Sequence, residues 1–199
     1  IEGGAPQASR RDAAAAPLPC LNINNSTEGR EKMRANTLSS GHRKTAFALA
    51  ENVERLADKY GVERLGFFTS TFADHVTDAR EASRRFNSLN THVLSKRYRE
   101  TITVLERQKS GRIHYHSIVV LPVDIRTGFN FDQAEKGVYS SANVYLRKEW
   151  AFWRTTAKAY GFGRTEMLPV KSTGEGIAKY CGKYIAKHIG TRETRDKGC

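Results

Sequence analysis

The chain has few of the residues on which several classes of protein depend. Its three cysteines, Cys20, Cys181 and Cys199, are an odd number without C-x-x-C spacing, which excludes a disulfide framework or a zinc knuckle. No apolar run approaches the roughly 18 to 20 residues of a membrane span, and Ala13 to Ala16 is too short for a signal core. No G-x-x-x-x-G-K-[ST] phosphate loop is present, and nothing indicates a nucleotide cofactor. These absences predict a soluble protein of a reducing cytoplasm.

Acidic residues are also scarce relative to basic ones. The 199 residues contain 33 Lys and Arg against 21 Asp and Glu, which gives a net charge of +12. Such an excess favours a polyanionic partner held through phosphates, and nucleic acid is the leading candidate. A generic basic surface would give the same count, so the charge requires a site beside it.

The apolar pattern divides the chain into an arm and one domain. Residues 1–40 hold three of the five prolines and little periodicity, which predicts a flexible N-terminal arm. Residues 41–199 are long enough for one globular domain. Helices are expected over Thr45–Tyr60, with Phe47, Ala50, Val53, Leu56, Ala57 and Tyr60 facing the core, from about Asp78, and over Asn143–Tyr160. Strands are expected over Leu65–Phe72, Thr101–Glu106, Arg112–Leu121 and Arg164–Val170.

The central feature is His114-Tyr115-His116 inside the third of these strands. Alternating side chains place both histidines on one face, as two ligands of one metal require. A three-residue turn at Lys109-Ser110-Gly111 would pair Glu106 with His114, Val104 with His116 and Ile102 with Ile118. Glu106 is therefore the expected third ligand. A two-residue turn would move it to the other face, leaving Glu100, Asp124 and Glu166 as substitutes.

A second constellation lies near the C-terminus. Tyr180 and Tyr184 are four residues apart on a predicted helix, and Lys183 and Lys187 follow them by three. A phenol is a poor nucleophile at neutral pH and gains from nearby ammonium charge, so two Tyr-x-x-Lys units predict nucleophiles for phosphoryl transfer. The lysines would alternatively stabilise the transition state or the leaving oxygen.

Three segments in this order resemble the HUH endonucleases, most closely the two-tyrosine rolling-circle replication initiators (Rep proteins) of phages and plasmids. Phe68-Thr-Ser-Thr-Phe72 is similar to their first strand motif, His114-Tyr115-His116 to their His-hydrophobic-His motif, and Tyr180-x-x-Lys183-Tyr184-x-x-Lys187 to their tyrosine motif. The resemblance spans roughly residues 62–190. It departs from the family pattern in having tyrosine between the histidines.

The resemblance implies an α+β fold with a mostly antiparallel five-stranded sheet flanked by helices, an HUH or RRM-like Rep nuclease fold. Only four strands are evident, and the interval Phe129–Tyr139 is a place for the fifth. The implied activity is a nickase that uses Mg²⁺ or Mn²⁺ to cleave single-stranded DNA at a replication origin, leaving a 5′-phosphotyrosine link. A host helicase and polymerase would be its partners, in the cytoplasm of the prokaryotic host of a phage or plasmid.

Two other functions remain open. Single-tyrosine HUH transposases share the order of histidines before tyrosine, whereas conjugative relaxases have the nucleophile near the N-terminus. A non-catalytic DNA-binding module of the same fold would use the histidines for a structural zinc, although two histidines and one acid make an incomplete site.

Overall fold

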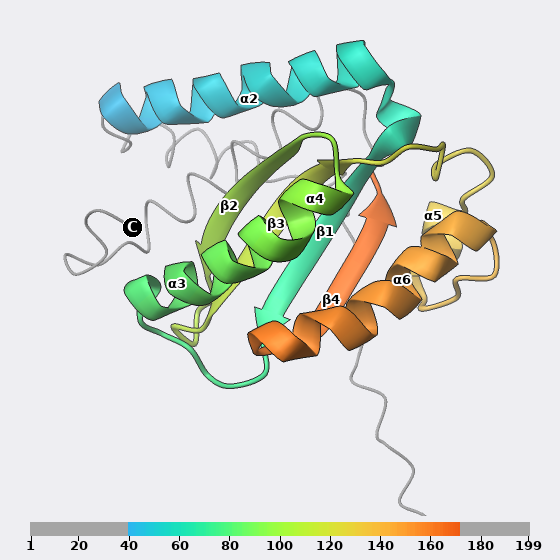
Figure 1. Cartoon of the computed structure of the whole chain (residues 1–199). Coiled ribbons are helices and arrows are strands. Elements are labelled where there is room, and N and C mark those ends of the chain that lie inside the picture. The colour runs from blue at the N-terminus through green and yellow to red at the C-terminus, as the bar shows by residue number, and fades with distance from the viewer. Residues whose placement is uncertain (1–39, 172–199) are drawn as a thin grey trace, which may run out of the picture.

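The computed structural model describes residues 40–171, which form helices around one four-stranded sheet (Figure 1). The strand order is β2-β3-β1-β4 and every neighbouring pair is antiparallel. The α+β class is therefore confirmed. The elements are α2 (Ser40–Tyr60), η1 (Val62–Arg64), β1 (Leu65–Phe72), α3 (Ala79–Leu89), η2 (Asn90–Leu94), α4 (Ser95–Arg97), β2 (Thr101–Arg107), β3 (Ile113–Val120), α5 (Phe131–Glu135), α6 (Val144–Thr156), η3 (Ala157–Tyr160) and β4 (Phe162–Pro169).

One face of the sheet packs against α3 and α6, which lie in front of it in Figure 1. Its core is aromatic: Phe68 meets Trp153 of α6 at 4.5 Å between ring centroids, and Tyr115 stacks on Phe86 of α3 at 4.0 Å. Asp78 caps α3 by accepting a hydrogen bond from the Glu81 backbone N–H. We call this side of the sheet the aromatic face.

A buried polar network joins α4 to α6 within this layer. The Glu149 carboxylate, 1% exposed, accepts hydrogen bonds from the Arg97 guanidinium at 2.6 and 2.9 Å and from the Tyr98 hydroxyl at 2.6 Å. The Trp153 indole N–H donates to the same hydroxyl. Burial, followed by the bond to Glu149, raises the pKa of Tyr98. The network satisfies the only acidic side chain of α6 internally.

The opposite face carries α2 over one end of the strands. Val53 and Leu56 of α2 are buried against Leu65, Ile118 and Val120. The expected helix is thus confirmed, but Phe47 was wrongly placed in the core. Its side chain is 66% exposed, because the N-terminal part of α2 extends past β2 (Figure 1).

The expected fifth strand is not found in residues 40–171. The interval Phe129–Tyr139 holds α5 instead, since the Asn130 side chain caps a helical turn by accepting from the Gln133 N–H. On β4, the outer carbonyl of Met167 accepts a hydrogen bond from the Trp150 indole at 2.6 Å, which occupies that edge position. The predicted arm, residues 1–40, lies outside the described residues except for Ser40. Within the described range, no helix combines the length and apolarity needed to cross a bilayer.

Candidate metal centre

The β2–β3 hairpin sets the register of the site. Gly111 adopts a left-handed φ of +82°, and the Gln108 N–H donates to the Arg112 carbonyl at 2.8 Å, closing the turn. Ile102 pairs with Ile118, Val104 with His116 and Glu106 with His114. The register predicted from the three-residue turn is confirmed.

This register brings three ligand-type side chains to one point. Glu106 Oε2 lies 2.8 Å from His114 Nε2 and 2.8 Å from His116 Nε2, and the two nitrogens are 3.2 Å apart. All three residues are at least 94% buried. We call this group the Glu–His–His cluster; it is a group that can hold a metal ion.

The separations within the cluster fit a single small divalent cation. If an ion lay about 2.1 Å from each atom, as is usual for Mg²⁺ or imidazole-bound metals, these distances would subtend angles of about 85° to 100°. Such angles suit octahedral coordination with positions left open for water or substrate. A buried carboxylate between neutral imidazoles also gains from a cation, because its charge is otherwise poorly compensated. The donor set therefore fits the expected Mg²⁺ or Mn²⁺.

The second ring nitrogen of each histidine is also held. His116 Nδ1 lies 3.0 Å from the Thr69 hydroxyl on β1, and His114 Nδ1 lies 3.1 Å from the Gln108 side-chain amide. Phe67 stacks on the His116 ring at 5.1 Å between centroids. When Nε2 holds a metal, Nδ1 carries the proton, which the Thr69 oxygen or the Gln108 Oε1 accepts. Sequence reasoning missed both partners, although the predicted register already placed Gln108 beside the turn.

The tyrosine between the histidines belongs to the other side of the sheet. Tyr115 is buried on the aromatic face, edge-on to Phe72, and its hydroxyl reaches Ser83 of α3 at 3.4 Å. The position requires a large ring that packs under α3, and tyrosine supplies it with its hydroxyl end at the rim.

The three substitute carboxylates lie elsewhere. Glu100 accepts hydrogen bonds from Arg55, Lys59 and Tyr60, which anchor α2. Asp124 accepts from the backbone N–H groups of residues 126 and 127. Glu166 is on β4, where its pairing partner Thr69 separates it from His116. Burial raises the pKa of Glu166.

The cluster is one end of a polar band across the four strands. Residues directly opposite in a sheet share a face, so Glu106, His114, Thr71 and Arg164 form one row. Val104, His116, Thr69 and Glu166 form the next row. An apolar pair, Ile102 and Ile118, follows toward α2. The band thus lies on the face opposite the aromatic face, beside the end that α2 covers.

The predicted nucleophiles cannot be placed by this geometry. Tyr180, Lys183, Tyr184 and Lys187 lie outside the described residues, and their roles remain predictions.

Comparison with known proteins identifies the family of this chain. Residues 66–189 match the family of replication-associated proteins of the ORF2 type. The chain belongs to this family. It is also 54% identical, over 192 residues, to the phasyl DNA replicon protein arp of Escherichia coli, covering 93% of this chain and 67% of that protein. No solved structure matches it significantly.

The family match has a physical counterpart in the fold. This replication-associated protein carries its Glu–His–His cluster on β2 and β3, inside the matched region, whereas α2 precedes that region. The resemblance drawn from three short motifs thus leads to a replication initiator of the phage and plasmid kind.

Proposed function

We propose that the protein is a metal-dependent, site-specific nickase and strand transferase of the HUH type that initiates rolling-circle replication. The observation that carries the proposal is the buried Glu–His–His cluster in a replication-associated protein. A replication initiator that exposes a 3′ end must break one phosphodiester bond, and this cluster fits a cation suited to that chemistry.

Glu106, His114 and His116 would hold Mg²⁺ or Mn²⁺, which polarises the scissile phosphate when bound. Tyr180 or Tyr184 attacks the phosphorus through its phenolic oxygen, and the bond from phosphorus to the 3′ oxygen breaks. The products are a 5′-phosphotyrosine and a 3′-hydroxyl, with the phenolic proton passing through solvent to the leaving oxygen. Lys183 and Lys187 favour the phenolate or neutralise the charge that develops on the phosphoryl group.

The described structure leaves the tyrosines within reach of the cluster. Residue 171 is anchored, because Lys171 Nζ lies 3.0 Å from Glu135 and its carbonyl accepts from Arg126. From there, five residues back along β4 and two strands across amount to about 20 Å. Nine residues separate position 171 from position 180, and an extended chain of that length spans about 30 Å. A nucleophile at Tyr180 therefore supports the proposal on distance.

The substrate of this reaction would be single-stranded DNA at an origin. Two tyrosines let one hold a new 5′ end while the other remains available for the next transfer. A host polymerase would extend the 3′-hydroxyl, and a host helicase would separate the strands.

The decisive experiment is adduct formation. Labelled single-stranded DNA covering candidate origins is incubated with the protein and Mn²⁺ or EDTA, and a denaturation-resistant protein–DNA species is sought on a gel. We expect a Mn²⁺-dependent adduct, lost in His114→Ala and His116→Ala but retained in His92→Ala. His92 is an exposed histidine, on the π-turn η2, and so provides a matched control.

The tyrosine variants test the nucleophiles themselves. Tyr180→Phe and Tyr184→Phe should each reduce the adduct and together eliminate it. An adduct that persists in the double variant would remove both tyrosines from the proposal. Tight DNA binding without any adduct would instead favour a non-catalytic module.

A further inference from the structure

A second charged surface lies on the side of the molecule away from the cluster. α6 and η3 cover the aromatic face, and their outward side contains the exposed cations Arg147, Lys148, Arg154 and Lys158. Their only acid, Glu149, is buried and paired with Arg97. We call these four cations the α6 surface; its positive charge is uncompensated within α6 and η3.

The spacing of the α6 surface makes it a row. Arg147, Arg154 and Lys158 fall at helical intervals of seven and four residues, with the small residue Ala151 between the first two. They occupy one stripe, about 17 Å long. Arg147 donates to the carbonyls of Ser140 and Ala142, which fixes that end of the row.

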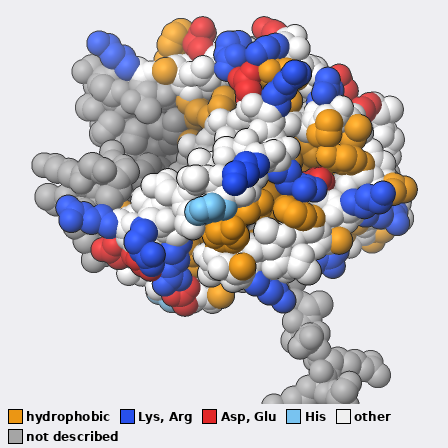
Figure 2. All heavy atoms as spheres, viewed as in Figure 1, with side chains coloured by type: hydrophobic (Ala, Val, Ile, Leu, Met, Phe, Trp, Pro, Cys, Tyr) orange, Lys and Arg blue, Asp and Glu red, His pale blue; other side chains and the backbone are white. Residues whose placement is uncertain are grey.

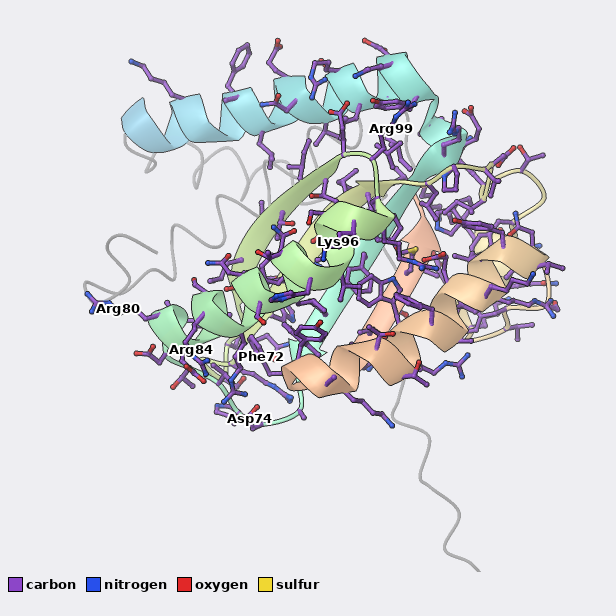
Figure 3. The ribbon with its side chains drawn as sticks, in the orientation of Figure 1. Phe72, Asp74, Arg80, Arg84, Lys96 and Arg99 are labelled. Atoms are coloured by element: carbon purple, nitrogen blue, oxygen red, sulfur yellow. The ribbon has the colours of Figure 1, made fainter. Side chains whose placement is uncertain are left out.

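The other helices of the described structure differ in this respect. On α3, Arg84 and Arg85 are paired with Glu81, and Arg85 also with Asp74. On α2, Arg55 and Lys59 are paired with Glu100. Figure 2, which views the aromatic-face helices, shows Lys and Arg side chains at both ends of the strip that α6 occupies. Lys96 of α4 is directed to the same side (Figure 3). The uncompensated charge is thus a local property of this side.

We propose that the α6 surface binds the phosphate backbone of duplex DNA, as a second nucleic-acid site separate from the Glu–His–His cluster. A straight row of cations matches a regular line of phosphates. The proposal rests on the proposed function in one respect, that DNA is the ligand.

The aromatic residues beside the row favour duplex over single-stranded DNA. Single-strand sites usually stack bases on open rings. Here the Phe152 ring lies 3.6 Å from the Arg97 guanidinium, Trp150 meets Tyr139, and Tyr160 meets His92. These rings already have partners, whereas backbone contacts need only the cations. The site would therefore hold origin duplex while the opposite face acts on a single strand.

The test compares two double variants of equal charge change. Arg154→Gln with Lys158→Gln neutralises the row, and Arg80→Gln with Lys44→Gln neutralises one Arg and one Lys elsewhere. Arg80 lies at the end of α3 remote from α6 (Figure 3), and all four side chains are exposed. Affinity for a labelled 20-base-pair duplex and for a single strand of equal length is measured by fluorescence anisotropy across a salt series.

We expect the row variant to lose about tenfold in duplex affinity near 0.1 M salt, with the slope of log K against log[salt] reduced by about 2. The control should change less than twofold, and single-strand binding should change less than duplex binding. Equal loss in both variants, no loss in the row variant, or loss confined to single-stranded DNA would each overturn the proposal.

The adduct assay separates this inference from the proposed function. The row variant should still form the Mn²⁺-dependent adduct on a single-stranded oligonucleotide. If wild-type protein forms no adduct but the row variant loses duplex binding, the nickase proposal fails and the duplex site stands. Circular dichroism and urea unfolding of both variants confirm that the fold is unchanged.

Discussion

Two hydrogen bonds hold the histidine rings of the cluster from behind. The Thr69 hydroxyl, itself 5% exposed, lies on the strand next to His116 and meets its Nδ1. Such partners fix the ring orientation and the tautomer that a metal ligand needs, and their loss typically costs 10- to 100-fold in metal affinity.

We therefore expect Thr69→Val, which keeps the shape and removes the hydroxyl, to weaken Mn²⁺ binding by about tenfold or more. Isothermal titration calorimetry of the full chain measures this directly. Thr103→Val is the matched control, because it removes a hydroxyl that pairs with Ser117 on the aromatic face. Equal affinities of Thr69→Val and wild type would show that this bond does not orient the ring.

At the scale of elements, the β2–β3 turn decides which side chains meet. Gly111 has a left-handed φ, and a Cβ there would find only Thr77 at 3.7 Å, which is ordinary contact. Any cost of a side chain at this position is therefore conformational rather than steric.

We expect Gly111→Ala to lower the free energy of unfolding by about 1 kcal/mol and Gly111→Asn by less, since asparagine tolerates the left-handed region. Urea unfolding provides the measurement. If both variants were as stable as wild type, the turn would not need glycine and its role in the register would be refuted.

For the whole molecule, acid sensitivity follows from how its carboxylates are paired. Hydrogen bonds from Lys59, Tyr60 and Arg55 lower the pKa of Glu100 to about 2 from its ordinary 4.5. Bonds from Arg84 and Arg85 lower the pKa of Glu81 to about 2. Because the unfolded chain binds more protons in this range, the stabilisation present above pH 4.5 is lost as pH falls toward 2.

Glu166 acts in the opposite direction, because burial raises its pKa. Its favourable contribution exists below pH 4.5 and is lost as pH rises through the raised value. We expect Glu166→Gln to increase the urea midpoint at pH 7 and Glu100→Gln to decrease it. The Glu100 variant should also lose less stability than wild type between pH 4.5 and 2. Shifts of the same sign at pH 7 would contradict these assignments.

Local pattern was sufficient for most of the elements and for the register of the cluster. Alternating β-branched residues placed both histidines on one face, and a glycine-terminated turn set Glu106 opposite His114. These features are encoded within about 15 neighbouring residues, where backbone geometry leaves few choices.

The sequence by itself determined the strands, the helices and the three residues of the cluster, because periodicity and turn chemistry act locally. Only the tertiary structure decided that Thr69 supports His116, that Phe47 is exposed, and that Phe129–Tyr139 contains a helix rather than a strand. Tertiary structure also separated Glu166 from the cluster by one strand and buried Glu149 beneath the α6 surface. These outcomes depend on which strands become neighbours and how far each helix overlaps the sheet, and those contacts join residues dozens of positions apart.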